Sequence, residues 1–388
     1  YRSEVFRRLY KKHVKSKGGL LQAWRDGEIE LNWTTVSRLL ELAYRCTMCR
    51  RCAQSCPIGV DNGLVTHELR KVFSQELGLS AKELHDSGSV LQLNVGSSTG
   101  MSPLVVKDNI EFIDEDTAER TGIEIETPWD KEGADFLLIH NAGEIMAWPE
   151  NPGAFAVLMN AAGLSWTLSS DLAAYDGINY CVWYDDVQFA RVAVRHAQAA
   201  KKLGVKKIVL GECGHAHKAL TVIADKVLTG DLNIPRESSM VTLREIVRSG
   251  KIEFDKSRND FPVTLHDPCN LVRWGGVSEP QRRILRKVVT DFVEMTPNRE
   301  DNICCGGGGG IMPMGPDYKP FRMASGKLKA DQIRETGAKI VITPCHNCFD
   351  QVNDLSEAYD LGVTAISLKE IIVESMIVPD HIKLNSDK

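Results

Sequence analysis

The chain has 388 residues, of which 43% are apolar and 26% are charged, as in an ordinary globular protein of two or three domains. No apolar run reaches the 18 residues of a membrane span, and the net charge of −5 argues against nucleic acid as a partner. The eleven cysteines are clustered, with four in 46–56 and five in 269–348, whereas disulfide scaffolds are short and cysteine-dense throughout. This clustering indicates metal ligation in a reducing compartment.

Residues 1–95 are predicted to be mostly helical and carry the first cysteine motif. The run CTMCRRCAQSCP has the spacing C-x2-C-x2-C-x3-C-P, with thiols at Cys46, Cys49, Cys52 and Cys56. Bacterial ferredoxins hold a 4Fe–4S cubane with this spacing, because a tight loop turns three thiolates onto one face of the cluster. We therefore predict a helical, ferredoxin-like 4Fe–4S module, in preference to a zinc site or chance clustering.

The fourth cysteine of this run leaves a choice open. In two-cluster ferredoxins it ligates the other cluster, yet only one such run is present here. Either Cys56 completes an atypical single cluster, or a second run precedes Tyr1 and the protein holds two cubanes. In the second case the fourth ligand of the cluster held by Cys46, Cys49 and Cys52 lies outside this sequence.

Residues 96–132 include the run GSSTGMSP and are predicted to be a linker. From residue 133 onward the pattern changes to short apolar runs such as ADFLLIH, KKIVLG, FPVTLHD and AKIVITP. Each run is bounded by turn residues, and helical stretches lie between the runs. This alternation predicts α/β layers with parallel strands.

The α/β part contains an internal repeat. FLLIHNAGE (136–144) resembles PVTLHDPCN (262–270), and GVKKIVLGECGHA (204–216) resembles GAKIVITPCHNC (337–348). The alignment pairs Gly143 with Cys269, Tyr180 with Cys304, Cys181 with Cys305, Cys213 with Cys345, and Ala216 with Cys348. We expect two related halves, 133–255 and 256–388, that face each other across a cleft, where sites are common.

The second cysteine group lies at the ends of the predicted strands or just after them, where a parallel sheet gathers its sites. Its members are Cys269, Cys304, Cys305, Cys345 and Cys348. A cubane or a tetrahedral zinc needs only four thiols. Adjacent residues of a strand point to opposite faces, so both thiols of the CC pair can face one cluster only if the backbone leaves the extended conformation. Glycine permits such a backbone conformation, and Gly306 and Gly307 are predicted to lie against a large inorganic cluster.

Other interpretations of this group stay open. A zinc ion bound by four thiols would leave one cysteine of the group without a role. A redox disulfide within a thioredoxin-like CHNC motif would leave three cysteines without a role. The glycine run could instead be a flexible loop or a phosphate cradle, although no GK[ST] follows it. A five-thiolate iron–sulfur cluster is preferred because it uses every cysteine of the group.

The segments HDPCN, CCGGG and CHNC together resemble the CCG domain of the catalytic subunit of heterodisulfide reductase, and the resemblance extends over nearly the whole chain. It implies a non-cubane 4Fe–4S cluster on the five cysteines, with the extra thiolate on an iron shared by two fused sub-clusters. The phrases GECGHAHKAL and SRNDFPVTLHDPCN look closest to cytoplasmic iron–sulfur subunits of transmembrane complexes in sulfate-reducing bacteria, of the Dsr, Tmc and Hmc types.

The first half departs from the family's two-cluster form, because Gly143, Tyr180 and Ala216 replace three ligands. This half is expected to hold no non-cubane cluster. Its Cys213 and His215 are expected to face the cleft and to assist proton or thiol chemistry, since histidine titrates near neutrality. The alternative is that both are packed remnants of an ancestral site.

The resemblance implies an iron–sulfur oxidoreductase subunit of a membrane-associated complex in anaerobic sulfate respiration. It would relay electrons between the cubane and the non-cubane cluster for disulfide or trisulfide chemistry. Implied partners are a membrane cytochrome b-type subunit, other iron–sulfur or multihaem cytochrome subunits, and a small disulfide or trisulfide carrier protein. The implied location is the cytoplasmic face of the cell membrane, where the subunit is peripheral.

Two other functions fit the same motifs. One is an electron conduit with no substrate of its own. The other is the iron–sulfur subunit of a flavin-linked dehydrogenase for an organic acid or glycerol phosphate. The sequence has no Rossmann glycine fingerprint, so the flavin of such an enzyme would sit on a partner.

Overall fold

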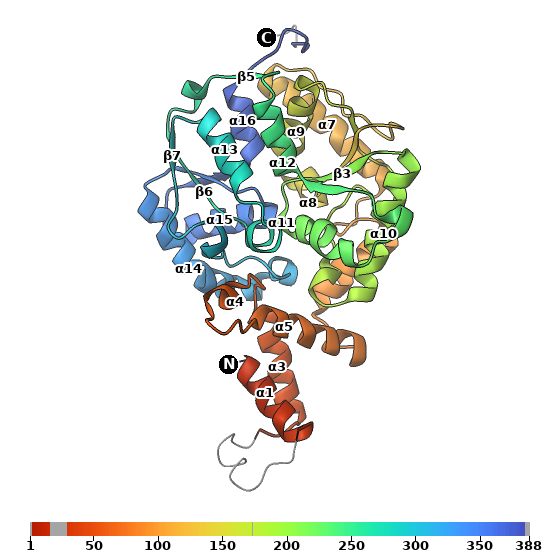
Figure 1. The fold of residues 1–388 in the computed structure, drawn as a ribbon, viewed down its shortest axis with the longest axis vertical. Helices are drawn as coiled ribbons and strands as arrows, with labels where there is room; N and C mark the ends of the chain where they lie inside the picture. The colour runs from red at the N-terminus through yellow and green to blue at the C-terminus, as the bar shows by residue number, and fades with distance from the viewer. Residues whose placement is uncertain (1, 16–28, 173, 385–388) are drawn as a thin grey trace.

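The computed structural model describes residues 2–15, 29–172 and 174–384, which form a helical N-terminal part and two α/β halves (Figure 1). Each half contains one parallel four-stranded sheet. The α/β fold class predicted from the sequence is thereby confirmed. Among these residues no helix is both long and apolar enough to cross a membrane.

The N-terminal helices form a small core of their own and extend from one end of the molecule (Figure 1). They are α1 (Arg2–His13), α3 (Trp33–Tyr44), α4 (Arg51–Ser55) and α5 (Asn62–Lys71). Helix α5 begins after Asp61, whose carboxylate accepts a hydrogen bond from the Leu64 amide. The first cysteine motif therefore lies on the loop and short helix between α3 and α5.

Three short elements lead from α5 towards the α/β halves. They are the π-helical turns η1 (Val72–Glu76) and η2 (Glu83–Val90), followed by α6 (Leu91–Val95).

The linker predicted for residues 96–132 is wrong, because this segment contains the 19-residue helix α7 (Pro103–Thr121). Ser102 caps the helix, and Val106, Ile110 and Ile113 are buried in the main core. These apolar residues recur at helical spacing just after the glycine- and serine-rich turn that suggested a linker. The domain boundaries themselves stay a prediction.

The two sheets have the same topology, with all neighbouring strands parallel. In the first half the order is β2-β1-β3-β4, with β1 at Phe136–Ile139, β2 at Trp166–Thr167, β3 at Lys207–Leu210 and β4 at Arg236–Ser238. In the second half it is β7-β6-β8-β9, with β6 at Pro262–Leu265, β7 at Asp291–Val293, β8 at Ile340–Ile342 and β9 at Thr364–Ile366. The internal repeat is therefore a repeat of architecture.

Helices connect and cover these strands. The first half has α8 (Ala142–Ala147), α9 (Glu150–Ala161), α10 (Asp186–Leu203), α11 (Gly214–His217) and α12 (Ser239–Arg248). The second half has α13 (Glu279–Val288), α14 (Lys319–Thr336), α15 (His346–Tyr359) and α16 (Leu368–Ser375). A short antiparallel pair, β5 (Glu253–Phe254) and β10 (Met376–Ile377), ties the end of the first half to the end of the second.

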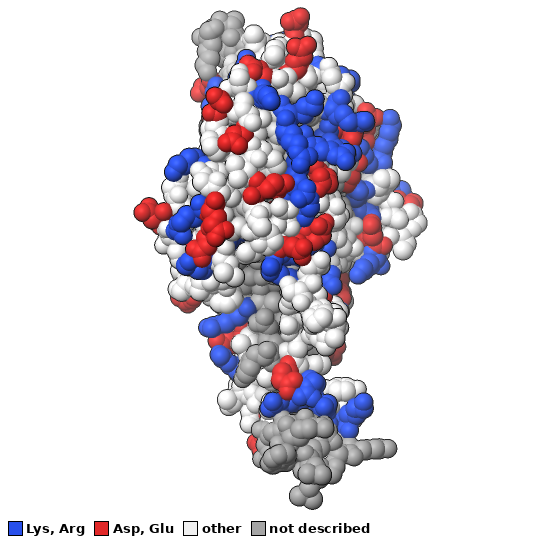
Figure 2. All heavy atoms as spheres, turned by 60° about the vertical axis from the view of Figure 1, so that its left-hand side comes forward, with Lys and Arg blue, Asp and Glu red and all other residues white. Residues whose placement is uncertain are grey.

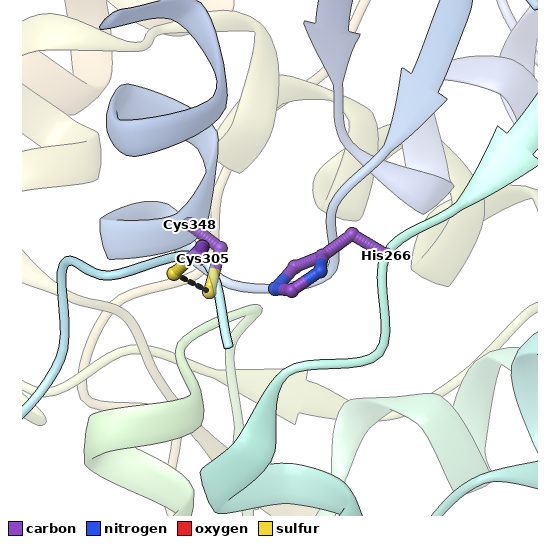
Figure 3. A group of neighbouring side chains, drawn as sticks. All are labelled: His266, Cys305 and Cys348. Atoms are coloured by element: carbon purple, nitrogen blue, oxygen red, sulfur yellow. Dashed lines mark hydrogen bonds between the residues drawn. The ribbon is translucent and has the colours of Figure 1, made fainter. Parts of the chain in front are cut away.

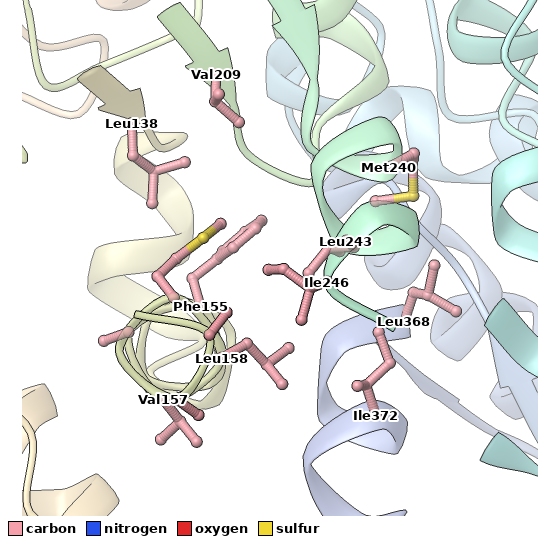
Figure 4. Packing of buried hydrophobic residues seen from close by; sticks show 14 of the residues in the cluster. Leu138, Phe155, Val157, Leu158, Val209, Met240, Leu243, Ile246, Leu368 and Ile372 are labelled. Carbon is pink, nitrogen blue, oxygen red and sulfur yellow. The ribbon is translucent and has the colours of Figure 1, made fainter. Parts of the chain in front are cut away.

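One hydrophobic core spans both halves. Figure 4 shows Phe155 and Leu158 of α9 close to Leu243 and Ile246 of α12, with Leu368 of α16 beyond them. All five side chains are almost fully buried. Burial of this shared apolar surface fixes the halves relative to each other, so that the carboxyl ends of their sheets can meet.

The surface charge is uneven despite the modest net charge. Figure 2 shows Lys and Arg side chains gathered on the upper part of one face. A hollow of about 350 Å³ between α12 and α13 is lined by Arg244, Arg248, Arg283, Arg286 and Lys287. This basic surface lies on the helices that cover the sheets, away from the cysteine motifs.

Candidate metal centre

The five cysteines of the second group follow three neighbouring strands of one sheet. Cys269 comes after β6, Cys304 and Cys305 come on the loop after β7, and Cys345 and Cys348 come after β8 at the start of α15. Four of the five side chains are at most 7% exposed, and Cys304 is half-buried. The carboxyl edge of the second sheet thus collects all five thiols where the sequence places them.

The thiols form a continuous group. The sulfur atoms of Cys305 and Cys348 lie 3.4 Å apart, and His266 points at the same place from the end of β6 (Figure 3). Ligand atoms of these three residues all lie within 4.8 Å of one another. Cys304 contacts Cys269 and Cys305, and Cys345 contacts Cys348. None of the eleven cysteines is in a disulfide.

Hydrogen bonds between neighbouring thiols shift their pKa values in opposite directions. Those shared with Cys304 and then Cys348 hold the pKa of Cys305 well below its usual range, and the one shared with Cys213 does the same for Cys345. The pKa values of Cys213, Cys304 and Cys348 are raised. Since metals bind thiolates, an arrangement that already favours some thiolates in the buried state suits metal ligation.

Two buried lysines border the thiols. Lys329 is 1% exposed and Lys218 is 3% exposed, and no carboxylate of the described residues forms an ion pair with either. Burial lowers the pKa of Lys329 to about 8 and that of Lys218 to about 7. The charges of Asp267 and then of the nearby cysteines oppose the shift of Lys329, and that of Cys269 opposes the shift of Lys218. A buried ammonium needs a negative partner. A thiolate-ligated cluster at this place would supply the negative charge, so these residues fit an iron–sulfur group.

His266 was not predicted as a site residue. Its ring is 1% exposed and lies beside Cys305 and Cys348, and a hydrogen bond with His266 also lowers the pKa of Cys305. A buried ring nitrogen within 4.8 Å of two thiols is placed to face the same metal group. The sequence signal was its position three residues before Cys269, where it also pairs with His140 in the repeat.

Cys304 of the second cysteine group lies beside the cysteines of the 46–56 motif. A cavity of about 300 Å³ is lined by Cys46, Cys49, Cys52 and Cys304 together. The Cys304 sulfur lies 3.6 Å from the Thr47 hydroxyl oxygen and also contacts Cys49, whose pKa it lowers to about 5. Cys304 therefore has neighbours in both motifs.

Cys56 lies outside that cavity. Backbone amides of Val60 and Ile58 hydrogen-bond to its sulfur and lower its pKa. The structure thus gathers three cysteines of the run, with Cys304 as the fourth thiol beside them, and leaves Cys56 facing another direction. A ligand role for Cys56 stays a prediction.

The glycine run lets the two motifs approach. Gly309 has a φ of +71°, and a β-carbon on it would lie 2.6 Å from the Cys46 carbonyl oxygen. Arg70, which is fully buried, donates hydrogen bonds to the carbonyls of Gly309 at 2.7 Å and Cys46 at 3.0 Å. Only glycine, which has no side chain, can pack this closely on the loop that carries Cys46 and Thr47.

The glycines singled out from the sequence are constrained by the protein itself. A β-carbon on Gly306 would lie 2.8 Å from the Arg322 carbonyl oxygen of α14, and one on Gly307 would lie 3.1 Å from Gln351 of α15. The Gly306 amide also donates to the Cys304 sulfur at 3.3 Å. Contact of Gly306 and Gly307 with a cofactor stays a prediction.

Among the site residues predicted in the first half, Cys213 lies against the second cysteine group. It contacts Cys345, and the Asn141 amide nitrogen lies 3.7 Å from its sulfur. His215 lies behind it, with Nε2 at 2.9 Å from the Asn179 carbonyl oxygen. Burial lowers the pKa of His215 to about 4, so its ring is neutral at pH 7. Cys181 is fully buried in a separate apolar cluster.

Comparison with known proteins adds to this geometry. The sequence pattern of the cysteine-rich CCG family matches residues 263–353. They contain all five cysteines of the second group.

Relatives cover more of the chain. It is 27% identical over 386 residues to the Hdr-like menaquinol oxidoreductase iron-sulfur subunit 2 of Archaeoglobus fulgidus, covering 89% of this chain and 69% of that protein. It is 25% identical over 371 residues to a subunit of the dihydromethanophenazine:CoB–CoM heterodisulfide reductase of Methanosarcina barkeri, covering 92% and 83%. The chain is thus related to heterodisulfide reductase-like iron–sulfur subunits, whereas the Dsr, Tmc or Hmc type stays a prediction.

The crystal structure of a hypothetical protein from Helicobacter pylori shares the fold. Its TM-score is 0.53 at 12% identity, and the match covers 97% of this chain and 76% of that one. This similarity concerns the fold alone.

Proposed function

We propose that the protein is the iron–sulfur subunit of a heterodisulfide reductase-like oxidoreductase. A 4Fe–4S cubane would be held by the 46–56 motif, and a non-cubane 4Fe–4S cluster by Cys269, Cys304, Cys305, Cys345 and Cys348. The observation that supports this most is the position of Cys304, which contacts Cys49 on one side and Cys305 on the other. Two redox groups on these motifs would be immediate neighbours.

The proposed reaction is the two-electron reduction of a disulfide or trisulfide. For a disulfide, the S–S bond takes up two electrons and two protons and yields two thiols. When bound, iron–sulfur clusters supply the electrons, one at a time. The protein's own residues exclude water from the thiols and offset their charge with Lys218 and Lys329.

Cys213 is proposed to act at the same site. It lies against Cys345 and remains protonated, because the bond to Cys345 and then burial raise its pKa. A protonated thiol next to the cluster can donate a proton to a departing sulfur. His215, neutral and bonded to a backbone carbonyl, is proposed to hold the helix that carries Cys213 in place.

The partners and the location are also proposals, which the resemblance stated from the sequence supports. The electron donor would be a membrane cytochrome b-type subunit or another iron–sulfur or multihaem cytochrome subunit. The sulfur substrate would be a small molecule or a small carrier protein. The subunit would then be peripheral on the cytoplasmic face of the membrane, and a role in sulfate respiration would fit the Dsr, Tmc and Hmc resemblance.

The test is iron and acid-labile sulfide content, measured under strict anaerobiosis. The double variant Cys304→Ala/Cys305→Ala should lose about four irons or more, since each 4Fe–4S unit carries four. Cys181→Ala is the matched control, because Cys181 is equally buried but lies apart from the group. Unchanged iron in the double variant, with circular dichroism showing a native fold, would contradict the second cluster.

Dye-linked reduction of disulfides then separates the candidate functions. Reduction by wild type but not by the double variant supports the reductase. Full cluster content without any disulfide reduction would favour an electron conduit, and co-purification with a flavoprotein would favour a dehydrogenase subunit.

A further inference from the structure

A basic groove of about 350 Å³ lies where α12 of the first half packs against α13 of the second. Its floor is apolar, because the half-buried Val247 and the buried Ile284 line it. Its rim is basic and consists of Arg244, Arg248, Arg283, Arg286 and Lys287. No cysteine and no carboxylate of the described residues lines this groove, so the chemistry proposed for the thiols leaves it without a role.

On α13 the exposed basic residues stand on one face of the helix. Arg286 and Lys287 follow Arg283 by three and four residues, which is the spacing of neighbours on a helix surface. The three side chains form no hydrogen bond or ion pair with another described residue, and Glu279, one turn before Arg283, is bound to Arg299 at 2.6 Å. Like charges at this spacing destabilise a helix, so this face would gain from an anion outside the chain.

Helix α12 adds two further cations, which share one carboxylate. Arg244 and Arg248 each bind Glu245 at 2.6 Å. Even with Glu245 counted, the five basic side chains of the rim leave the groove positive, in a chain whose net charge is −5. A local surplus of this kind attracts and orients a partner of the opposite charge.

The shape and the floor of the groove distinguish between kinds of anionic partner. A small free anion would bind at the rim and leave Val247 and Ile284 uncovered. The surface of a bilayer is flat on this scale, so it would meet the rim but not the floor. An acidic amphipathic helix meets both, because its apolar side chains cover the floor while its carboxylates face the guanidinium groups, which bind carboxylates with two parallel hydrogen bonds.

We propose that the groove between α12 and α13 docks an acidic amphipathic helix of a partner protein. The groove lies away from the cysteine motifs, so docking here serves the assembly of a complex and not the transfer of electrons. Each half supplies one wall, so the docked helix contacts both halves at once. The inference is independent of the chemistry proposed for the thiols.

The test compares two fluorescein-labelled peptides of about 18 residues, a length at which an isolated helix can form. Both carry leucines at helical spacing, and the opposite face carries glutamate in one peptide and glutamine in the other. Binding to the anaerobically purified, cluster-containing protein is measured by fluorescence anisotropy at about 0.1 M salt, where exposed charges still interact over roughly 10 Å. The glutamate peptide should bind at least about tenfold more tightly, because only its carboxylates pair with the basic rim. Equal affinities would overturn the proposal.

Variants then localise the preference. The triple variant Arg283→Gln/Arg286→Gln/Lys287→Gln should lose about tenfold or more of its affinity for the glutamate peptide and none for the glutamine peptide. Val247→Ser should weaken both peptides roughly threefold, because part of the apolar contact is lost. Unchanged affinity for both peptides in Val247→Ser would overturn the helix as the occupant.

The matched control is Lys82→Gln/Lys226→Gln/Lys339→Gln, which removes the same charge at three exposed lysines outside the groove. This variant should keep the wild-type preference for the glutamate peptide. Equal losses in the two triple variants would assign the preference to net charge and overturn the proposal. The comparison of the two peptides on the wild type still decides if a variant fails to fold.

Two other anionic partners are outcomes of the same experiment. Vesicles of phosphatidylglycerol in phosphatidylcholine, and free tripolyphosphate, are tested with the wild type and both triple variants. If either binds through Arg283, Arg286 and Lys287 while the two peptides bind alike, the groove is a lipid or a phosphate site and the proposal is overturned.

Discussion

The imidazole of His346 occupies the space that a side chain at Gly143 would need. A β-carbon built on Gly143 would lie 2.8 Å from Cε1 of His346. Gly143 is the first-half counterpart of Cys269 in the repeat, and His346 belongs to the CHNC segment of the second half. A side chain of the second half thus fills the place where the first half would need room for a cysteine at position 143.

Gly143→Ala should therefore destabilise the protein, although alanine ordinarily favours a helix over glycine. His346 is held by Asn141 at 3.1 Å and packs on Trp148, so the ring cannot move freely. Overpacking of this kind costs about 1–3 kcal/mol. The measurement is anaerobic urea unfolding followed by tryptophan fluorescence.

A double-mutant cycle checks the cause. In a His346→Ala background, Gly143→Ala should cost little, because the clashing ring is gone. An equal cost in both backgrounds would show that the contact with His346 is not responsible.

Gly309→Ala should separate the two cysteine motifs. The new methyl group would meet the backbone of Cys46 and Thr47, where nothing flexible can yield. We expect a cost above about 1 kcal/mol, together with a lower iron content. Iron analysis and thermal unfolding of the same preparation measure both effects.

Gly337→Ala is the matched control. Gly337 has a φ of +67°, close to that of Gly309, but a β-carbon there would have open space around it. This variant therefore reports backbone strain alone. If Gly309→Ala proved no more costly than Gly337→Ala, close packing on the backbone of Cys46 and Thr47 would not be the reason for the glycine.

The glycine contacts separate what the sequence can predict from what only the packing of the fold decides. The cysteine spacing and the repeat predicted the α/β halves and the convergence of five cysteines, because parallel strands gather their carboxyl ends at one edge. The glycine run was predicted to lie against a cluster, which stays a prediction, and the structure shows in addition that it packs on protein backbone. Which backbone meets Gly309 depends on packing between segments far apart in sequence, here residues 46–47.

The same limit applies to the buried charges. Nothing in the local pattern around Lys218 or Lys329 distinguishes them from solvated lysines of a helix face. Their burial follows from contacts across the whole fold. In the same way, the glycine- and serine-rich run before α7 marked a turn but not the helix behind it, whose buried residues pack against the first half.

Glu212 and Lys369 should make stability depend on pH. They form a fully buried ion pair of 2.9 Å that joins the two halves beside Cys213. Burial raises the pKa of Glu212 from 4.5 to about 7. The folded state therefore binds the Glu212 proton more tightly than the unfolded state, and protonation of Glu212 stabilises the fold. This contribution to the free energy of unfolding is complete below pH 4.5 and is lost as the pH rises through 7.

The loss is on the order of 3 kcal/mol across that range. Glu212→Gln has no titrating group and should show a flatter stability profile between about pH 5 and pH 8 in urea unfolding, whatever its absolute stability. Glu111→Gln, which alters an exposed carboxyl group of α7, should retain the wild-type slope. An identical slope in Glu212→Gln would assign the pH dependence to other groups.

His266 should tune the electron affinity of the proposed cluster without holding it. Its ring nitrogens lie within reach of the Cys305 and Cys348 sulfurs, and hydrogen bonds to thiolate ligands raise a cluster's reduction potential. His266→Phe keeps a ring of similar size but removes the donor. We expect full iron content and a reduction potential lower by up to about 60 mV, which for one electron corresponds to the ~1.4 kcal/mol of a single hydrogen bond.

Anaerobic redox titration followed by low-temperature electron paramagnetic resonance measures this shift. His140→Phe is the matched control, because His140 is the buried counterpart of His266 in the first half, where it packs on Phe155 away from the five thiols. That variant should leave the potential unchanged. Loss of iron in His266→Phe would instead make His266 a ligand, and the site would then be a mixed histidine–thiolate centre in place of a five-thiolate one.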